Sequence, residues 1–366
     1  MSNKVNISTI LRPFGFIYGI ITETRNRMYD CGLFKSHRFD IPVISIGNIT
    51  VGGTGKTPHT EHLIKLLNKD YKIAVLSRGY GRKSKGFVQY TEQETATTLG
   101  DEPYQMATKF PTVQVAVHSN RAEGIEQLLQ YNSYDAILLD DAFQHRRVKP
   151  STNILLVDYN RNILEDCMLP AGRLREWAYN RKRADVIIVS KCPDNITEQE
   201  MMRLKKRLGN NGQKIFFTKI KYGQTYSIEH PNTLLNLEQE KESSILLLSG
   251  IASPKQMHRY LKKFTKNISL LEFADHHSFS DKDIHNIEQA FLSLKGEKRY
   301  IITTEKDAAR LKSINLKEEI KSSLYILPIE IEFVKDGTQF DRYIIEQIKN
   351  KQQNNGYTFR LFRYKL

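Results

Sequence analysis

A glycine-rich loop is the clearest candidate for chemistry in this sequence of 366 residues. The residues TVGGTGKT directly follow a buried-strand pattern at Val43–Ile46 and precede a helix that begins near Pro58. Glycines in such a turn let backbone N–H groups approach a triphosphate, and the lysine and threonine that follow would reach phosphate and magnesium. We therefore expect nucleotide binding by Thr50, Val51, Gly52, Gly53, Thr54, Gly55, Lys56 and Thr57.

The loop departs from the strict phosphate-binding pattern at one position. Thr50 stands where G-x-x-x-x-G-K-[ST] has its first glycine. The strand before the loop, the helix after it and Pro58 in the first helical turn still favour nucleotide binding. The alternative is a glycine turn with a purely structural role.

Two adjacent carboxylates, Asp140 and Asp141, come directly after the apolar run Ile137–Leu139. A phosphate loop needs a carboxylate from a neighbouring strand to complete the magnesium shell. Carboxylates at the end of an apolar strand are costly unless they hold a cation or end in water. We therefore expect both, with Thr57, to hold magnesium, and a solvated strand end is the alternative. The basic loop Ala142–Arg147 that follows would lie at the sheet edge where ligands bind.

Two further polar clusters could orient or deprotonate an attacking hydroxyl, as phosphoryl transfer requires. Asp101 lies in the motif GDEP, which spans Gly100–Pro103. It is a candidate for the base, and it could equally be the N-cap of a helix. In Asp275–His277, consecutive histidines point to different sides, so at most one could face a site. A surface or zinc-binding pair is the alternative, although no further ligands occur at zinc spacing. A histidine that meets an aspartate from the other half of the chain would form a tunable base.

Positive groups for a substrate phosphate occur in two glycine-bearing loops. Arg78 lies in SRGYGR, and Arg173 and Arg175 lie in LPAGRLRE, at Leu169–Glu176. A guanidinium in such a loop could bind phosphate through two N–H groups, although a solvated basic surface is an equal alternative for each. Residues Thr303–Asp307 close another predicted strand and would contact nucleotide or cap a helix.

Short runs rich in valine, isoleucine and leucine predict the α/β framework that positions these groups. Helical patterns at His59–Asn68 and Arg121–Tyr131 lie between such runs, which is typical of βαβ units with a parallel sheet. The runs predicted as buried strands are Val43–Ile46, Ile73–Leu76, Val113–Val117, Ile137–Leu139, Ile154–Val157 and Val186–Val189.

A second series of strand patterns follows a polar stretch at Gln224–Ser244. We expect residues 41–213, together with an N-terminal segment 1–40, to form a phosphate-loop domain, 214–244 to form the linker region, and 245–366 to form a smaller α/β domain with a return strand near 323–333. The tail Phe359–Leu366 could be an edge strand or a basic surface contact, and we favour the strand. The second series comprises Ile245–Leu248, Ile268–Phe273, Tyr300–Thr303 and the alternating stretch Leu324–Phe333.

The first forty residues are the only candidate for membrane contact, and they are not expected to cross a bilayer. The longest uncharged stretch, Pro13–Thr22, spans ten residues, whereas a bilayer needs ~20, and it does not resemble a signal peptide. We therefore expect a cytoplasmic protein. An apolar stripe surrounded by basic residues fits an anionic membrane interface. Packing on the protein's own body is the favoured alternative from the residues alone, because apolar stripes usually face a core. The stripe comprises Ile10, Phe14, Ile17, Ile21 and Met28.

Composition argues against several classes of protein. Hydrophobic residues at 40% and charged residues at 26% are typical of a globular chain and not of a disordered or collagenous one. Three cysteines without a CxxC motif provide neither a disulfide framework nor a zinc cluster, which fits a reducing compartment. The formal net charge of +14 predicts phosphate-rich or anionic-lipid partners.

Together these motifs resemble those of the tetraacyldisaccharide 4′-kinases, the lipid A disaccharide kinases of Gram-negative bacteria. The resemblance runs from about residue 10 to about residue 335 in the family's motif order, and the family's loop characteristically lacks the first glycine, as at Thr50. Ala142 and Arg173 depart from the family pattern in ways that concern local loop geometry alone. The matching motifs are GNITVGGTGKTP, SRGYGR, GDEP, DDAFQH, LPAGRLRE, DHH and TTEKDA.

The resemblance implies two α/β/α domains, the first with a P-loop NTPase-like, mostly parallel sheet, joined by a short β linker. It implies that ATP and Mg²⁺ bind in the cleft, and that the γ-phosphate passes to the 4′-hydroxyl of tetraacyldisaccharide 1-phosphate to give lipid IVA. It further implies a peripheral protein on the cytoplasmic face of the bacterial inner membrane, without an obligate protein partner.

The resemblance also implies roles for individual residues. Asp101, paired with His276, would be the base, and Lys56 would steady the γ-phosphate. Asp140 and Asp141 would manage magnesium. The residues implied to contact substrate are Arg78, Gln144, His145 and Arg175.

Two rival functions stay open at this point. A membrane-bound ATPase switch that transfers no phosphate has a similar loop, but it typically carries a lysine where this sequence has Val51. A nucleic-acid binder would account for the charge of +14, but the basic and aromatic residues form no recognisable module. We therefore expect no nucleic-acid partner.

Overall fold

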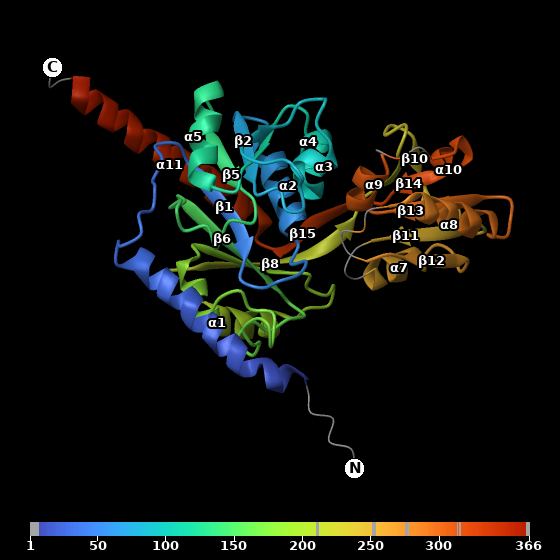
Figure 1. Cartoon of the computed structure of the whole chain (residues 1–366), viewed down its shortest axis with the longest axis horizontal. Helices are drawn as coiled ribbons and strands as arrows, with labels where there is room; N and C mark the ends of the chain where they lie inside the picture. Colours follow the sequence, from blue (N-terminus) through green and yellow to red (C-terminus); the bar gives the residue numbers. More distant parts are fainter. Residues whose placement is uncertain are drawn as a thin grey trace, which may run out of the picture.

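The apolar runs form two sheets that lie side by side, each with helices on its faces (Figure 1). The computed structural model describes residues 7–209, 212–250, 254–274, 277, 279–312, 314 and 316–363, with side chains from Ile10 to Gln353. Within these residues the large sheet has nine strands and the smaller sheet has six. The predicted α/β class with a mostly parallel first sheet is confirmed.

The large sheet contains all six of the strands predicted in the first half of the chain. Seven neighbouring strands, from β8 to β4, run parallel, and an antiparallel strand closes each edge. The central strands are buried along their whole length because helices cover both faces. In spatial order the strands are β15 (Ile329–Lys335), β8 (Lys214–Tyr222), β7 (Val186–Ser190), β6 (Thr152–Asp158), β1 (Val43–Asn48), β5 (Ala136–Leu139), β2 (Ile73–Ser77), β4 (Gln114–Val117) and β3 (Val88–Gln89).

Helices of the first half follow the predicted βαβ pattern, and the last helix returns to the same sheet. Phe340, Ile344 and Ile348 on the last helix join one apolar core with Ile44 and Ile46 of β1. This segment lies within the range assigned to the smaller domain, yet it packs on the large sheet; the domain boundaries themselves stay a prediction. The helices are α2 (Lys56–Leu67), α3 (Ala96–Leu99), α4 (Asp101–Lys109), α5 (Arg121–Tyr131), α6 (Glu198–Leu208) and α11 (Gly337–Arg363).

The C-terminal tail was wrongly expected to form an edge strand. Helix α11 begins at Gly337 and continues to Arg363, so most of Phe359–Leu366 is helical. The physical reason is that Phe340, Ile344 and Ile348 recur every four residues, which starts a helix against the large sheet, and the helix continues past that contact.

The smaller sheet has four neighbouring parallel strands, and two further strands extend one side of it through antiparallel pairings. Its apolar core packs under helices that follow the strands. In spatial order the strands are β10 (Leu234–Leu235), β9 (Thr225–Ser227), β14 (Leu324–Ile326), β13 (Arg299–Thr303), β11 (Ser244–Ser249) and β12 (Ile268–Glu272). The helices are α7 (Lys255–Leu261), α8 (Asp281–Leu292), α9 (Glu305–Leu311) and α10 (Glu318–Ser322).

The stretch Leu324–Phe333 is divided between the two sheets, which corrects its prediction as one strand. Strand β14 pairs with β13 of the smaller sheet, whereas β15 pairs with β8 of the large sheet. Pro328 stands between them and has no N–H for a ladder, so the strand ends there. The antiparallel pair β8 and β15 therefore joins the two sheets (Figure 1).

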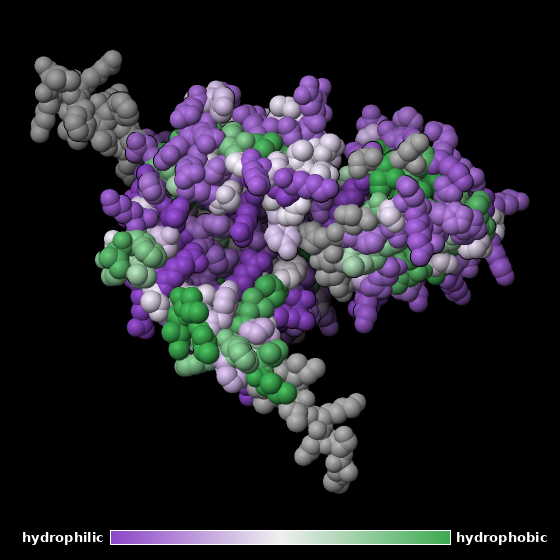
Figure 2. All heavy atoms as spheres, viewed as in Figure 1, coloured by the Kyte–Doolittle hydropathy of each residue, from purple (hydrophilic) through white to green (hydrophobic). Residues whose placement is uncertain are grey.

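Helix α1 (Ile7–Asp30) packs on the large domain through small residues and leaves its bulky apolar face exposed. A Cβ atom at Gly19 would lie 2.6 Å from the ring of Trp177, so the helix approaches that ring closely. The predicted apolar stripe lies on the outside, with Phe14 60%, Ile17 55% and Ile21 62% exposed. Figure 2 shows these hydrophobic atoms gathered along α1. Ile10, Phe14, Ile17 and Ile21 of this stripe therefore do not pack on the protein's own body, which corrects the expectation favoured from the residues alone, whereas Met28 is half-buried.

A network of buried and half-buried charges joins the two sheets. The Nζ atom of Lys109, on α4, lies 2.6 Å from Glu61 on α2 and 2.5 Å from Glu305 on α9. Nearby, the Nζ atom of Lys306 on α9 lies 3.0 Å from Glu102 on α4. Burial, and next the charge of Glu305, raise the pKa of Glu61 to about 7, because two carboxylates share one ammonium group.

Replacing Glu61 by glutamine should stabilise the protein at pH 8 and leave its stability at pH 5 almost unchanged. The pKa of Glu61 rises from 4.5 to about 7 on folding, so its stabilising contribution is present below about pH 4.5 and is lost as the pH rises to about 7. The gain in the free energy of unfolding at pH 8 should be on the order of 1–3 kcal/mol. Thermal midpoints between pH 5 and pH 8 test this, with exposed Glu126→Gln as the control. Parallel curves for Glu61→Gln and wild type would contradict it.

Candidate active site

The phosphate loop connects the carboxyl end of β1 to the first turn of α2. Gly52 and Gly55 have φ angles of +99° and +87°, values that only glycine adopts without strain. The Nδ2 atom of Asn48, the last residue of β1, donates to the Oγ1 atom of Thr54 at 2.7 Å and fixes the inside of the turn. The loop therefore has a defined shape, with the amino end of α2 directed into it.

The loop LPAGRLRE runs beside the phosphate loop and pairs with its first residues. The N–H of Val51 donates to the carbonyl of Arg173 at 2.8 Å, and the N–H of Arg175 donates to the carbonyl of Ile49 at 2.8 Å. This pairing places the guanidinium of Arg175 at the entrance of the site. The two motifs, far apart in the sequence, are thus one structural unit.

Asp140 follows β5 and is buried beneath the phosphate loop. It is 5% exposed, and its carboxylate accepts hydrogen bonds from Thr60 at 3.2 Å and Ser77 at 3.1 Å. Burial, and next the charge of Asp141, raise the pKa of Asp140 to about 6. The alternative of a solvated pair of aspartates does not hold for Asp140.

Asp141 faces the lysine of the phosphate loop. Its carboxylate lies 3.7 Å from Nζ of Lys56 and 3.3 Å from Nη1 of Arg175. Burial alone would raise the pKa of Asp141, but Lys56 and Arg175 outweigh this effect and hold it below its usual value. Its φ of +46° lies in the left-handed region, which is uncommon for a residue other than glycine. The site thus pairs one ionised aspartate with one that protonates more easily.

The donor atoms of this site fit a magnesium ion. Asp140, Asp141 and Thr57 offer only oxygen ligands, which Mg²⁺ prefers, and the buried carboxylate of Asp140 accepts from the hydroxyls of Thr60 and Ser77. Among the described residues, no group of three histidine, cysteine or acidic side chains could hold a metal alone. A magnesium ion here would therefore need phosphate oxygens of a nucleotide as further ligands.

Gln144 and His145, two predicted substrate contacts that follow the aspartates, differ in how their side chains are engaged. The Nε2 atom of Gln144 donates to the carbonyl of Asn48 at 2.6 Å and to Glu176 at 2.9 Å, so this amide holds the end of β1 in place. The ring of His145 is half-buried. Burial, and next the positive charge of Arg121, lower its pKa to about 3, so it is neutral at pH 7.

Arg78 lies near these groups, and its side chain is exposed. Arg78 directly follows β2, which runs parallel to β5, so it lies at the same edge of the sheet as the aspartates that follow β5. Gly79, which follows it, has a φ of +69° and comes close to the carbonyl of Leu99, just before GDEP. The loops SRGYGR and GDEP therefore meet at this edge.

Asp101 begins helix α4, whose N-cap is Gly100, so the N-cap role considered for Asp101 is not what the structure shows. Its Oδ2 atom lies 3.0 Å from Nε and 2.5 Å from Nη2 of Arg310, on α9. Its predicted partner His276 lies outside the described residues, so that pair stays a prediction. The neighbouring His277 contacts Asp283 at 2.9 Å and stacks on Phe273.

The TTEKDA motif forms the start of α9. The Oγ1 atom of Thr304 accepts a hydrogen bond from the N–H of Asp307 at 3.1 Å, which caps the helix as one of the two alternatives predicted. The motif also supplies Glu305 and Lys306, which contact α4 of the other sheet. Its part in the site is thus to place α9 against the helix that carries Asp101.

The sequence reading missed a group of residues on the other side of the phosphate loop. Lys191 has a φ of +59°, and its ammonium group contacts the carbonyl of Gly53 and, at 3.0 Å, the carboxylate of Asp158. Both Lys191 and Asp158 stand at the carboxyl ends of predicted buried strands. The same rule that singled out Asp140 would have found them.

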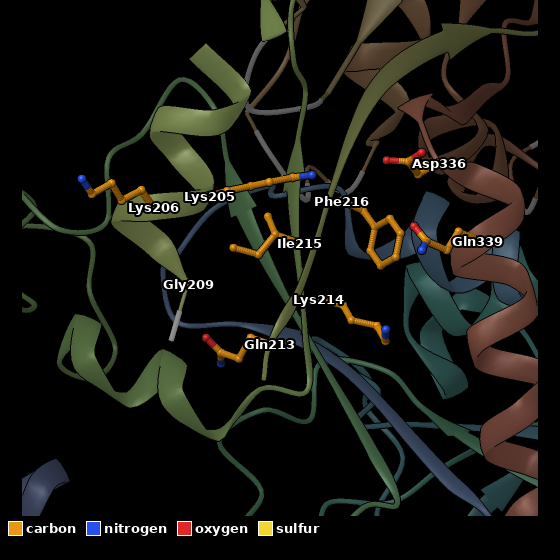
Figure 3. A pocket seen from close by; sticks show the side chains of 9 residues that line it. All are labelled: Lys205, Lys206, Gly209, Gln213, Lys214, Ile215, Phe216, Asp336 and Gln339. Carbon is orange, nitrogen blue, oxygen red and sulfur yellow. The ribbon is translucent and has the colours of Figure 1, made fainter. Parts of the chain in front are cut away.

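A cavity of about 410 Å³ lies elsewhere on the large domain (Figure 3). Lys214, Ile215 and Phe216 line it at the amino end of β8, whereas the phosphate loop follows the carboxyl end of β1. Because β8 and β1 run in the same direction, the cavity lies at the opposite edge of the sheet. We therefore do not assign it to the active site.

Comparisons of this chain with known proteins all indicate the same family. The sequence model of the family described as tetraacyldisaccharide-1-P 4′-kinase matches residues 7–349. The tetraacyldisaccharide 4′-kinase of Phocaeicola vulgatus is 46% identical over 365 residues, covering 97% of this chain and 99% of that protein. The protein of the same name from Flavobacterium johnsoniae is 47% identical over 343 residues, covering 93% of this chain and 97% of that protein.

A solved structure agrees with the sequence comparisons. The crystal structure of LpxK from Aquifex aeolicus in complex with ATP is similar with a TM-score of 0.74 and 29% identity. The match covers 94% of this chain and all of that chain. With a family match over nearly its whole length, the chain belongs to the tetraacyldisaccharide-1-P 4′-kinase family.

Proposed function

We propose that this protein transfers the γ-phosphate of ATP to the 4′-hydroxyl of tetraacyldisaccharide 1-phosphate, as the names of its relatives indicate. The observation that carries this proposal is the convergence of the phosphate loop, two aspartates and Asp101 at one edge of the large sheet. An ATPase switch would need no acceptor site, and family membership supports the kinase over that rival.

Different charged groups would bind the phosphates of ATP and neutralise their charge. Lys56 and the N–H groups of the loop would hold the β- and γ-phosphates, and magnesium bound by Asp140, Asp141 and Thr57 would neutralise their charge. Lys56 and Arg175 both contact Asp141 in the structure. We infer that both cations are shared with phosphate oxygens when ATP and magnesium are present.

The transfer step itself requires one proton acceptor. The 4′-oxygen attacks the γ-phosphorus, the bond to the β–γ bridging oxygen breaks, and ADP leaves. The proton of the hydroxyl passes to the carboxylate of Asp101, which we propose as the base together with His276. Arg310, which donates to Oδ2 of Asp101 from Nε and Nη2, would keep that carboxylate oriented.

The substrate contacts differ from residue to residue. Arg78 is exposed and cationic, so we propose that it contacts a phosphate of the acceptor. His145, neutral in its half-buried position, would donate or accept a hydrogen bond at the sugar. Gln144 donates to Asn48 and Glu176, so we propose that it shapes the site without binding substrate directly.

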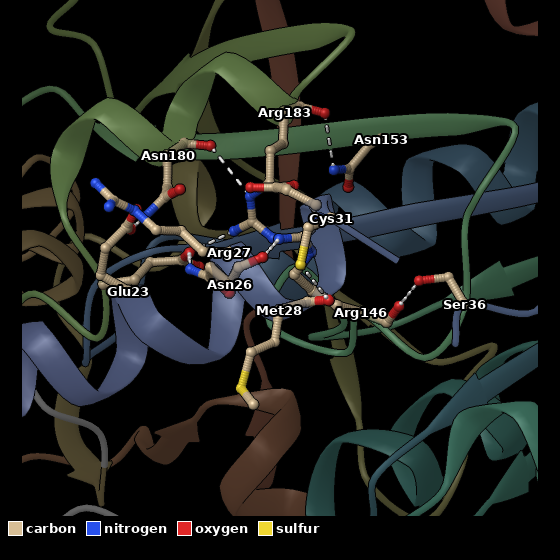
Figure 4. Close-up of polar contacts among 12 residues, drawn as sticks. Glu23, Asn26, Arg27, Met28, Cys31, Ser36, Arg146, Asn153, Asn180 and Arg183 are labelled. Atoms are coloured by element: carbon tan, nitrogen blue, oxygen red, sulfur yellow. Dashed lines mark hydrogen bonds and ion pairs between the residues drawn. The ribbon is translucent and has the colours of Figure 1, made fainter. Parts of the chain in front are cut away.

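Helix α1 would place the site on the membrane that holds the lipid acceptor. None of the described helices combines the length and apolar character needed to cross a bilayer. The carboxyl half of α1 is anchored by polar contacts: Arg146 donates to the carbonyl of Asn26 at 2.7 Å and to Asp30 at 2.6 Å, and Asn26 donates to Glu176 at 3.1 Å. Figure 4 shows Asn26 and Arg146, which belong to this anchor. The exposed apolar face of α1 would insert among the lipids on the cytoplasmic face of the inner membrane, so that the protein would bind this membrane peripherally.

Transfer of labelled phosphate from γ-labelled ATP to tetraacyldisaccharide 1-phosphate in detergent micelles tests the proposed reaction. We expect labelled product at the 4′ position, a requirement for Mg²⁺, and a loss of at least a hundredfold in turnover for Lys56→Ala with an unchanged fold. Lys69→Ala, on the surface after α2, is the matched control. Free phosphate with unlabelled lipid would point to the ATPase switch.

Asp101→Ala should lower kcat by about 10²–10⁴-fold while leaving the affinity for ATP nearly unchanged, because a base acts only in the transfer step. Steady-state kinetics together with equilibrium ATP binding separate the two effects. The control is Asp70→Ala, an exposed aspartate after α2. A change confined to ATP affinity would remove Asp101 from the role of base.

Ile17→Glu should weaken binding to vesicles that contain anionic phospholipid by about tenfold or more. Inserting one such side chain into an apolar phase contributes about 1.5–3 kcal/mol, and a carboxylate cannot replace it. Co-sedimentation measures the effect, and Leu234→Glu, an exposed leucine of the smaller sheet, is the control. Equal binding of both variants and wild type would show that α1 does not insert.

A further inference from the structure

Three consecutive carbonyl groups of the phosphate loop accept hydrogen bonds from side chains outside the loop. The donors come from the carboxyl end of β7 and from the first turns of α2, on the side of the loop away from Asp140 and Asp141. The pairs are Lys191 with Gly53, Ser190 with Thr54, and His59 with Gly55.

Lys191 is held in an uncommon backbone conformation to make its contact. Its φ of +59° lies in the left-handed region, which costs free energy for a side chain of this kind and occurs most often at functional sites. Its ammonium group contacts the carbonyl of Gly53 and lies 3.0 Å from Asp158, which is 4% exposed. Because Asp158 balances its charge, Lys191 acts on the loop mainly through geometry.

Ser190 and His59 hold the next two carbonyls from buried positions. The Oγ atom of Ser190, whose residue is fully buried, donates to the carbonyl of Thr54 at 2.7 Å. Burial lowers the pKa of His59 to about 4, so the ring is neutral and carries one N–H. Because a carbonyl can only accept, that hydrogen lies on Nδ1, 2.6 Å from the carbonyl of Gly55, and Nε2 accepts from Thr218 at 2.9 Å.

The peptide geometry converts these three contacts into a binding surface. In a planar trans peptide, the C=O and the next residue's N–H point in opposite directions. Holding the three carbonyls outward therefore turns the N–H groups of Thr54, Gly55 and Lys56 toward the inside of the loop. None of these three N–H groups donates to another group in the described part of the chain. They form an anion-binding surface at the amino end of α2.

We propose that Lys191, Ser190 and His59 are positioning residues that hold the phosphate loop in its ATP-binding shape before the nucleotide arrives. The proposal rests on the proposed function in one respect, that ATP is the ligand of this loop. Without these donors, the peptides rotate more freely, and ATP binding has to order them. The three residues do not contact the reacting atoms, so their effect is on ATP affinity.

Lys191→Gly and Ser190→Ala test this proposal in the full-length protein. Glycine accepts the φ of residue 191 without strain, so Lys191→Gly removes the ammonium group and preserves the backbone. Each variant should bind Mg²⁺-ATP about five- to tenfold more weakly by titration calorimetry, with an unchanged KM for the lipid acceptor. The nucleotide-free thermal midpoint should stay within a few degrees of wild type, and its rise on adding ATP should shrink.

Two control variants accompany this test, and three outcomes would contradict the proposal or its premise. Lys214→Met changes a lysine at the opposite end of the sheet, and Ser45→Ala removes a buried hydroxyl in β1 that has no hydrogen-bond partner; both should bind ATP like wild type. If Lys191→Gly and Ser190→Ala bind ATP as tightly as wild type while Lys56→Ala binds it more weakly, the positioning role is overturned and the phosphate-loop function stands. Unchanged binding in Lys56→Ala overturns the phosphate-loop function itself. A raised acceptor KM together with a large loss of nucleotide-free stability would show a merely structural role.

Discussion

Negative charge at the carboxyl edge of the large sheet is the constraint on which the rest of the site depends. Asp140 and Asp141 are neighbours in sequence, and a triphosphate would add further negative charge beside them. The structure separates the two aspartates by environment: Asp140 is buried among hydroxyl donors, whereas Asp141 faces Lys56 and Arg175. The resulting site has a buried carboxylate where a divalent cation would be stabilised, and cations that phosphate oxygens could share.

The smaller sheet contributes to this site through one short helix. Helix α9 presents Glu305, Lys306 and Arg310, and each meets an opposite charge on α4. Ion pairs at such an interface add little net stability, because desolvation offsets their attraction, but they tolerate few alternative alignments. The network therefore fixes how α4, and with it Asp101, lies relative to the smaller domain.

The sequence predicted features that depend on local patterns and missed those that depend on distant contacts. Buried parallel strands are apolar along their whole length, so the six parallel strands of the first half were found, whereas the two-residue edge strand β3 was not. The stretch Leu324–Phe333 looked continuous because its alternation persists across Pro328, although that residue ends the ladder. The phosphate loop and both aspartates were found from local spacing. The contact of Asp101 with Arg310 joins residues 209 positions apart, and no local pattern signals it.

Helix α1 shows why a pattern of apolar residues alone does not decide which face of a helix packs. Apolar side chains occupy much of its circumference, so both a packed face and an exposed face could be read from the sequence. Close packing requires small residues, and Gly15, Gly19 and Asn26 are the buried positions of the helix. An alanine methyl at Gly19 would overlap Trp177, so this face is committed to the protein body. The bulky stripe on the other side is in excess of what folding requires, and a surface of this kind is typical of a binding face for an apolar phase.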